Sequence, residues 1–147
     1  MIFTIPIAPH TKKNSSEICY NPVTKVRFIK PSKIYSKYAE DCGYFIPKNF
    51  LHAKINQPIN IKCTFFMASR RPVDLPNLLN AIDDILVHYG VLEDDNCRII
   101  VSHDGSRVYY DKENPRTVVE ITKSQDTEFF PIVEKKPTKR QTRAKNK

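Results

Sequence analysis

Glycine is scarce in this 147-residue chain, which has only Gly43, Gly90 and Gly105. A phosphate-binding P-loop needs closely spaced glycines, so that type of nucleotide site is excluded. Neither a Ser-His-Asp order nor a His-Glu-x-x-His motif is present. We therefore expect no small-molecule cofactor and no serine-hydrolase or zinc-protease chemistry.

Long apolar runs are also missing. No stretch approaches the roughly 20 residues of a membrane-spanning helix. The apolar N-terminal segment has no preceding basic residues and meets Pro6 and Pro9, where a signal peptide would continue its hydrophobic stretch. We expect a cytoplasmic protein with no membrane association.

Cysteine usage points to reduced thiols. The four cysteines, Cys19, Cys42, Cys63 and Cys97, are each more than twenty residues apart and form no Cys-x-x-Cys pair. That spacing disfavours both a zinc site and a disulfide framework. We expect the cysteines to serve as small, partly buried apolar residues.

Charge is divided along the chain into basic, acidic and basic segments. The net charge is +8, with twelve Lys and Arg against three Asp and Glu in residues 1–73, and five against thirteen in residues 74–134. Residues 135–147 carry seven basic residues and no acidic one. Basic segments are typical of proteins that bind the phosphate backbone. An acidic block would repel DNA unless a divalent cation neutralised it.

Periodicity predicts the secondary structure. Strands are expected at residues 1–7, in a hairpin of residues 17–20 and 25–29, and at residues 59–67, 98–102 and 117–122. One amphipathic helix begins after Ser32 and stops at Pro47, and a second begins at Asp74 and ends at Gly90. The order β-ββ-α-β-α-ββ predicts an α/β (α+β) fold with a mixed sheet and two main helices.

The chain is expected to contain one domain followed by a tail. Residues 1–123 carry the periodic pattern, whereas residues 124–147 lose it and end in a strongly basic run. We expect this tail to be disordered in isolation. It is either a nonspecific DNA-gripping arm or a solubilising extension with no defined partner.

Six carboxylates stand between Asp74 and Asp95 without one Lys or Arg. On the predicted helix, Asn77, Asn80, Asp84 and His88 form a polar stripe opposite the leucines. Carboxylates combined with water and substrate phosphate are what Mg²⁺ prefers. For any single carboxylate, the alternative is a solvated acidic helix face followed by an acidic turn. His88 could shuttle a proton, although a solvent-facing helix histidine is the more common case.

The segment from Arg70 to Asp95, RRPVDLPNLLNAIDDILVHYGVLEDD, resembles the central motif of RusA-type Holliday-junction resolvases. The family pattern has a basic run, Asp-x-Asp-Asn-Leu, a Lys three residues after that Asn, an Asp four residues further on, a Gly and an Asp-Asp pair. The match here is ungapped through Arg70, Arg71, Asp74, Leu75, Asn77, Leu78, Asp84, Leu86, Gly90, Asp94 and Asp95. The order of elements over residues 1–123 is similar as well.

This resemblance implies an endodeoxyribonuclease active in DNA recombination and repair. Such a protein is a homodimer that binds four-way junctions and nicks two strands symmetrically, using Mg²⁺ or, as a substitute, Mn²⁺. The expected catalytic residues are Asp74 and Asp95, with metal ligands drawn from Asp74, Asp84, Asp94 and Asp95. The expected DNA contacts are Lys12, Lys13, Arg70, Arg71, Asn77 and Asn80.

Two positions depart from the family pattern. Pro76 stands where the family has the second Asp of Asp-x-Asp, and Asn80 stands where it has the Lys. Asp84 or Asp94 could supply the missing carboxylate, and Lys12, Lys13, Arg70 or Arg71 could supply the missing cation. The alternative is a catalytically impaired protein that binds branched DNA without cutting it.

A third interpretation is a single-stranded nucleic-acid binder. Tyr35, Tyr38, Tyr44, Phe45 and Phe50 would stack on bases near Lys33, Lys37 and Lys48. The spacing of these aromatic residues is also typical of a helix face buried in a core.

Overall fold

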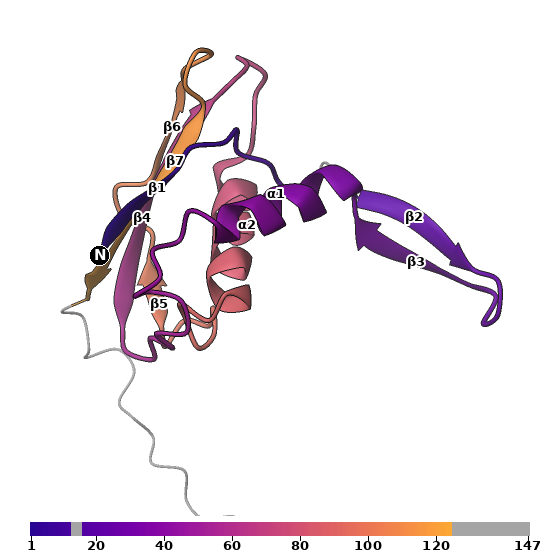
Figure 1. Cartoon of the computed structure of the whole chain (residues 1–147), viewed down its shortest axis with the longest axis horizontal. Coiled ribbons are helices and arrows are strands. Elements are labelled where there is room, and N and C mark those ends of the chain that lie inside the picture. The colour runs from indigo at the N-terminus through magenta and orange to yellow at the C-terminus, as the bar shows by residue number, and fades with distance from the viewer. Residues whose placement is uncertain (13–15, 125–147) are drawn as a thin grey trace, which may run out of the picture.

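The computed structural model describes residues 1–12 and 16–124. The elements in chain order are β1 (Ile2–Ile5), β2 (Ser16–Asn21), β3 (Val26–Pro31), α1 (Lys33–Gly43), β4 (Ile59–Met67), α2 (Leu75–His88), β5 (Ile100–Ser102), β6 (Arg107–Tyr110) and β7 (Arg116–Lys123). The chain is a mixed α+β protein with two helices in this part, as the sequence predicts (Figure 1).

The main sheet is mixed. Its strands follow the order β1-β7-β4-β5, and β6 pairs with the same central strand β4. Pairings of β7 with β1 and β4 are antiparallel, whereas β5 and β6 run parallel to β4. Strand β4 therefore occupies the middle of the sheet, and its side chains alternate between the two faces.

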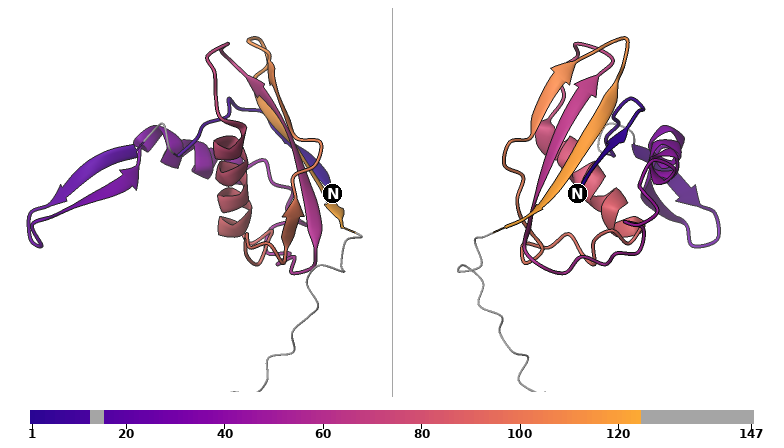
Figure 2. Two further views of the ribbon diagram at one scale, coloured as in Figure 1. Left: turned by 180° about the vertical axis from the view of Figure 1, so that it is seen from behind. Right: turned by 60° about the vertical axis from the view of Figure 1, so that its left-hand side comes forward.

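Both helices cover one face of this sheet (Figures 1 and 2). On β4, Ile61, Cys63 and Phe65 point to that face and are fully buried, while the residues between them are partly exposed. Helix α2 contributes Leu78, Ile82 and other apolar side chains to the same core. The apolar side chains thus hold α2 against the sheet and leave its opposite side facing solvent.

The predicted start of α1 and both predicted ends of α2 are confirmed, whereas α1 ends at Gly43, with Tyr44 as its C-cap, and not at Pro47. The Ser32 hydroxyl accepts a hydrogen bond from the Tyr35 amide at 3.2 Å and caps α1. Gly90 follows the end of α2 with a φ of +68°, the left-handed conformation that favours glycine. A Cβ added at Gly90 would also meet the backbone of His52 at 3.3 Å.

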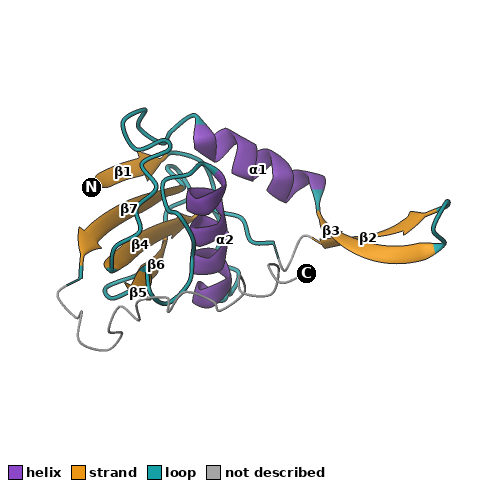
Figure 3. Cartoon of the chain, turned by 90° about the horizontal axis from the view of Figure 1, so that it is seen from below, coloured by secondary structure: helices purple, strands orange, loops and turns teal. Residues whose placement is uncertain are grey.

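Two elements differ from the prediction. Strand β6 is an addition, because the polar connection between the last two predicted strands contains this four-residue strand, which pairs with the end of β4. The predicted hairpin forms, but β2 and β3 make a separate two-stranded sheet outside the main one. Figure 3 shows this hairpin projecting from the start of α1, away from the main sheet.

The prediction that aromatic residues of α1 stack on single-stranded bases is wrong for Tyr35 and Tyr38. Tyr35 and Tyr38 are 3% and 4% exposed and belong to the core. Burial raises the pKa of both phenols. Only Tyr44 and Phe45 of that set are exposed, so the described residues present no continuous aromatic platform along α1.

The prediction of partly buried cysteines holds for three of the four positions, because Cys97 is exposed. All four cysteines are free thiols, with Cys42 and Cys63 buried in the core. Burial is the main cause that raises the pKa of Cys42 to about 12. Within residues 1–12 and 16–124, no helix is both long and apolar enough to cross a membrane.

Candidate active site

The first carboxylate of the site stands at the start of α2. Asp74 is the N-cap residue, and its main-chain oxygen accepts hydrogen bonds from the amides of Asn77 and Leu78. Its side chain makes no capping bond to the helix and instead accepts a hydrogen bond from the Asn77 side-chain amide at 3.1 Å. Pro76 lies in the first helical turn, where its missing N–H breaks no helix hydrogen bond. The Asp74 carboxylate is therefore exposed and oriented by Asn77.

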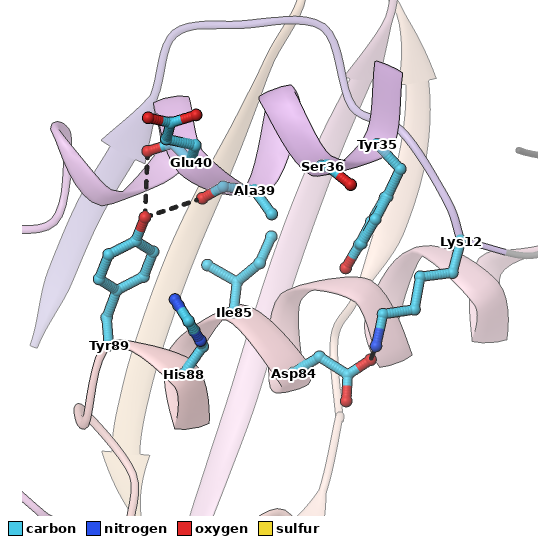
Figure 4. A pocket seen from close by; sticks show the side chains of 9 residues that line it. All are labelled: Lys12, Tyr35, Ser36, Ala39, Glu40, Asp84, Ile85, His88 and Tyr89. Carbon is cyan, nitrogen blue, oxygen red and sulfur yellow. Dashed lines mark hydrogen bonds and ion pairs between the residues drawn. The ribbon is translucent and has the colours of Figure 1, made fainter. Parts of the chain in front are cut away.

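The polar stripe continues along the exposed side of α2 to Asp84. Lys12, from the segment after β1, reaches this carboxylate with its ammonium group 2.5 Å from Oδ2 of Asp84. The same ammonium group lies 5.8 Å from the centre of the Tyr35 ring. Figure 4 shows Lys12, Asp84 and His88 around a cavity between α1 and α2. The structure thus places a basic side chain one turn after Asn80.

The remaining carboxylates lie in the turn after α2. The Asp94 carboxylate accepts hydrogen bonds from the Asn96 side chain at 2.6 Å and from the Asp95 amide at 2.9 Å. These bonds hold the pKa of Asp94 below its usual value. Desolvation raises the pKa of Asp95, and its hydrogen bond to Asp94 and the charges of Asp94 and Asp84 act in the same direction. The negative charges in and near this turn therefore lie close together and repel one another.

The predicted metal ligands fall into two groups. Asp84 follows Asp74 by ten residues, or about 15 Å of helix rise. The charges that raise the pKa of Asp95 are those of Asp94 and Asp84, and Asp74 is not among them. In the described part of the chain, no group of three or more His, Cys, Asp or Glu residues is placed to hold a metal ion. The structure thus associates Asp84, Asp94 and Asp95 and leaves Asp74 at the other end of the stripe.

These carboxylates nevertheless fit a hard divalent cation. Mg²⁺ commonly takes one or two carboxylates and completes its shell with water and substrate phosphate, so a cage of three protein ligands is not required. Asp95 carries a negative charge that its neighbours disfavour, and a cation would relieve this repulsion. Asp74 is exposed and does not use its carboxylate to cap its own helix.

The predicted DNA contacts occupy two places. Arg70 and Arg71 are exposed in the segment before α2, close in sequence to Asp74, and the Arg70 guanidinium lies 4.2 Å from the centre of the Tyr110 ring. Asn77 is engaged with Asp74, and Asn80 is exposed on the stripe. Lys13 lies outside the described residues. Arg70 and Arg71 thus lie near the Asp74 end of α2, and Lys12 lies beside Asp84 farther along the helix.

One ionisable pair was not predicted from the sequence. Asp83 points toward the sheet and is 6% exposed, and its Oδ2 lies 3.1 Å from Nε2 of His103. The other ring nitrogen, Nδ1, lies 2.9 Å from the main-chain oxygen of Ile61. Asp83 lies one turn from Leu79 and Leu86, so the helical pattern could have placed it on the buried side.

We expect this pair to make stability depend on pH. Both ring nitrogens of His103 face acceptors, so the doubly protonated imidazolium satisfies both. Burial lowers the pKa of His103, but the hydrogen bond and charge of Asp83 outweigh it and the pKa is raised overall. A pKa that is raised in the folded state adds to the free energy of unfolding. This contribution is fully present below the ordinary histidine pKa and is lost as pH rises through the folded-state pKa. Unfolding free energy should therefore be highest below the ordinary histidine pKa of about 6.5 and should fall as pH rises through the raised pKa of His103.

Urea unfolding across this range checks the prediction. The His103→Gln variant should show a flatter dependence of unfolding free energy on pH than the wild type. His88→Gln, on the exposed side of α2, should keep the wild-type slope because the pair remains intact. An unchanged slope in His103→Gln would show that the pair has no such role.

The fold and the site define a class of protein. A small α+β domain carries exposed carboxylates and basic side chains along one helix, an arrangement suited to metal-assisted hydrolysis of a phosphodiester. The family model described as endodeoxyribonuclease RusA matches residues 6–122. Because this match covers most of the chain, the protein belongs to the RusA endodeoxyribonuclease family.

The family assignment gives the general activity. RusA proteins are endodeoxyribonucleases, a type of hydrolase, and they bind branched DNA and resolve Holliday junctions. They depend on a divalent metal ion. A search of curated proteins gives no match to this chain.

Proposed function

We propose that this protein is a Mg²⁺-dependent endonuclease that resolves four-way DNA junctions during recombination and repair, acting in the cytoplasm as a homodimer. Mn²⁺ is proposed as a substitute metal. The observation that carries this proposal is the set of solvent-facing carboxylates at the start of α2, on α2 and in the turn after it, namely Asp74, Asp84, Asp94 and Asp95, in a chain of the RusA family. The segment from Asp74 to Asp95 has no Lys or Arg of its own, so a cation is needed before it can approach a phosphate.

The proposed ligands are Asp74 at the start of α2 and Asp84, Asp94 and Asp95 toward and beyond its other end, with Asp74 and Asp95 as the catalytic residues. A bound Mg²⁺ would supply an activated water and would stabilise charge on the scissile phosphate. Asn77 orients the Asp74 carboxylate through its hydrogen bond, and Asn96 does the same for Asp94. Asp84 is held by Lys12.

Lys12 is proposed to replace the cation that the family carries at the position of Asn80. Its ammonium group sits at Asp84, which is one helical turn from Asn80 on the same side of α2. Arg70 and Arg71 are proposed to hold the DNA backbone at the Asp74 end. Such phosphate contacts fix the position of DNA without reading its sequence.

A protein that binds junctions without cutting them is the second candidate. It is favoured by Pro76, which cannot supply a carboxylate, and by Asn80, which has no charge. Under this candidate, the basic residues keep their role and the carboxylates remain a solvated face. The two candidates differ only in turnover.

A direct assay separates these candidates. The protein is incubated with an end-labelled four-way junction, a matched duplex and a matched single strand, each with Mg²⁺ or with EDTA. The proposal expects Mg²⁺-dependent nicks in the junction alone. Tight junction binding without nicks would identify the binder, whereas preference for the single strand would contradict both candidates.

The basic run at residues 135–147, which lies outside the described residues, leads to a prediction about affinity. Deleting it should weaken binding to junction and duplex alike, because its seven basic residues can neutralise phosphates. Each lost phosphate contact should reduce the slope of log affinity against log salt by about 0.9. Fluorescence anisotropy at several salt concentrations measures this slope, and an unchanged slope would contradict a DNA-gripping role.

A further inference from the structure

The face of the main sheet opposite the helices carries a row of side chains that crosses three adjacent strands. Phe66 on β4 lies directly opposite Tyr109 on β6 and Arg116 on β7. The rings of Phe66 and Tyr109 are stacked with their centres 5.5 Å apart, and the Arg116 guanidinium lies 3.6 Å from the centre of the Phe66 ring. Figures 1 and 2 show both helices on the other side of the sheet. The row is therefore an ordered aromatic surface that is open to solvent at Tyr109, which is 49% exposed.

Hydrogen bonds at one end of this row hold Arg116 in place. Its Nη1 donates to Oδ2 of Asp111 at 2.8 Å and to the main-chain oxygen of Asn114 at 2.7 Å. Phe66 thus has an ordered neighbour on each flank, Arg116 from β7 and Tyr109 from β6. Strand β6 pairs with β4 and with no other described strand, so it forms an edge of the sheet. The outer side of the Tyr109 ring is the place where a further flat group could extend the stack.

A basic side chain stands beside Tyr109 on this edge. Side chains two residues apart on a strand point to the same face, so Arg107 shares the open face with Tyr109. Arg107 is exposed, and within residues 1–12 and 16–124 it forms no ion pair with a carboxylate. Its guanidinium is therefore available to an anionic group that lies next to the Tyr109 ring.

This edge of the sheet lies next to the start of α2. An open hollow of about 580 Å³ is found there, and its lining consists of Leu75, Ser106, Arg107, Val108 and Tyr109. Leu75 directly follows Asp74, the first of the proposed catalytic residues. The Arg70 guanidinium, from the segment before Asp74, lies 4.2 Å from the centre of the Tyr110 ring on β6. Contacts on both sides of Asp74 thus bring β6 close to that end of the proposed site.

A ligand for this edge needs a flat aromatic part and a negative charge beside it, and an unpaired nucleotide has both. Every nucleobase has a π face that can stack on an aromatic side chain. A guanidinium binds a phosphate through its planar set of N–H donors. Bases inside a duplex stack on one another, so a tyrosine ring can stack only on a base that has left the duplex. Continuous stacking is interrupted where strands exchange in a four-way junction, so a base is less costly to expose at that point.

We propose that Tyr109 and Arg107 form a binding site for one unpaired nucleotide at the branch point of the DNA substrate. The base stacks on the outer side of the Tyr109 ring and extends the row that runs through Phe66 to Arg116. Arg107 binds the phosphate of the same nucleotide. Holding the branch point at the edge of β6 brings the adjoining strand to Asp74. The inference rests on the proposed junction substrate and adds to it a contact that does not involve the metal.

Photo-cross-linking in EDTA locates the base without metal-dependent cleavage. One four-way junction carries iododeoxyuridine at its branch point, and a second carries it inside one of the duplex branches. Irradiation of the first complex should cross-link the base to Tyr109, which mass spectrometry detects in the tryptic peptide of residues 108–112. The second junction should give no product on this peptide, because its labelled base stays inside a duplex.

Affinity for the junction in EDTA, measured by fluorescence anisotropy, separates a base contact from a structural role. Tyr109→Leu keeps apolar cover beside Phe66 but removes the ring, so it should weaken junction binding by about tenfold, as expected for the loss of one stacked base. Tyr109→Phe keeps the ring and should bind like the wild type. Arg107→Gln should also weaken junction binding, and each of these variants should bind a fully paired duplex with unchanged affinity. Tyr44→Leu, at a tyrosine that is 79% exposed at the end of α1, is the matched control and should change neither affinity.

Three results would overturn the inference. An equal loss of affinity for junction and duplex in Tyr109→Leu would make this ring a structural part of the sheet or a general DNA contact. An equal loss of junction affinity in Tyr44→Leu would show that the effect is not specific to β6. Cross-links confined to other peptides would place the branch point elsewhere. A wild type that cross-links at Tyr109 but never nicks the junction in Mg²⁺ would contradict the proposed function and support this site.

Discussion

Asp74→Asn and Asp95→Asn should each reduce the rate of junction cleavage by about a thousandfold or more, which is the loss typical when a group central to charge stabilisation is removed. Each change removes a carboxylate proposed to hold Mg²⁺ and alters almost no volume. Junction affinity should persist, because the proposed phosphate contacts are basic residues.

Single-turnover cleavage assays at saturating protein measure this effect, and anisotropy measures binding separately. Asp104→Asn is the matched control, since Asp104 is also an exposed aspartate and lies outside the α2 segment. It should cleave at the wild-type rate. Retention of Mg²⁺-dependent nicking by Asp74→Asn would remove Asp74 from the site and leave Asp84, Asp94 and Asp95 as the metal-binding group.

Phe65→Ala should reduce the free energy of unfolding by about 3–5 kcal/mol, which is typical for a truncated buried aromatic side chain. Phe65 is 0% exposed and lies on the central strand β4, so its loss opens a cavity between the sheet and the helices. The total free energy of unfolding of a domain of this size is about 5–15 kcal/mol. The variant should therefore unfold at much lower urea concentration.

Phe66→Ala provides the control on the same strand. Phe66 lies on the opposite face, stacks with Tyr109 at 5.5 Å and has the Arg116 guanidinium 3.6 Å from its ring centre. Because this face is open to solvent, Phe66→Ala should reduce the free energy of unfolding by only about 1 kcal/mol. Equal losses at the two positions, measured by urea unfolding, would contradict the packing of β4 described above.

Local patterns predicted most of the fold. Strand β4 has the expected bounds because Ile59, Ile61, Cys63 and Phe65 alternate with polar residues. Helix α2 begins and ends as predicted because Asp74 and Gly90 are strong boundary signals. Strand β6 was not predicted because four residues contain too little periodicity, and its formation depends on pairing with the distant strand β4.

The site was predicted less completely. The acidic segment and its likeness to the RusA motif can be read from neighbouring residues. The contact of Lys12 with Asp84 joins residues 72 positions apart, and the pair of Asp83 with His103 needs the packed sheet. No local pattern contains such contacts. The sequence also could not show that the hairpin of β2 and β3 stands away from the main sheet.

A plasmid with an extruded cruciform tests the central claim most directly, because it carries a four-way junction within a closed circle. Two symmetric nicks by a dimer convert the plasmid to the linear form, whereas one nick gives an open circle. With Mg²⁺, the account predicts linear product from the wild type and none from Asp95→Asn or in EDTA. A plasmid that is bound tightly by the wild type but stays supercoiled in Mg²⁺ and in Mn²⁺ would contradict it.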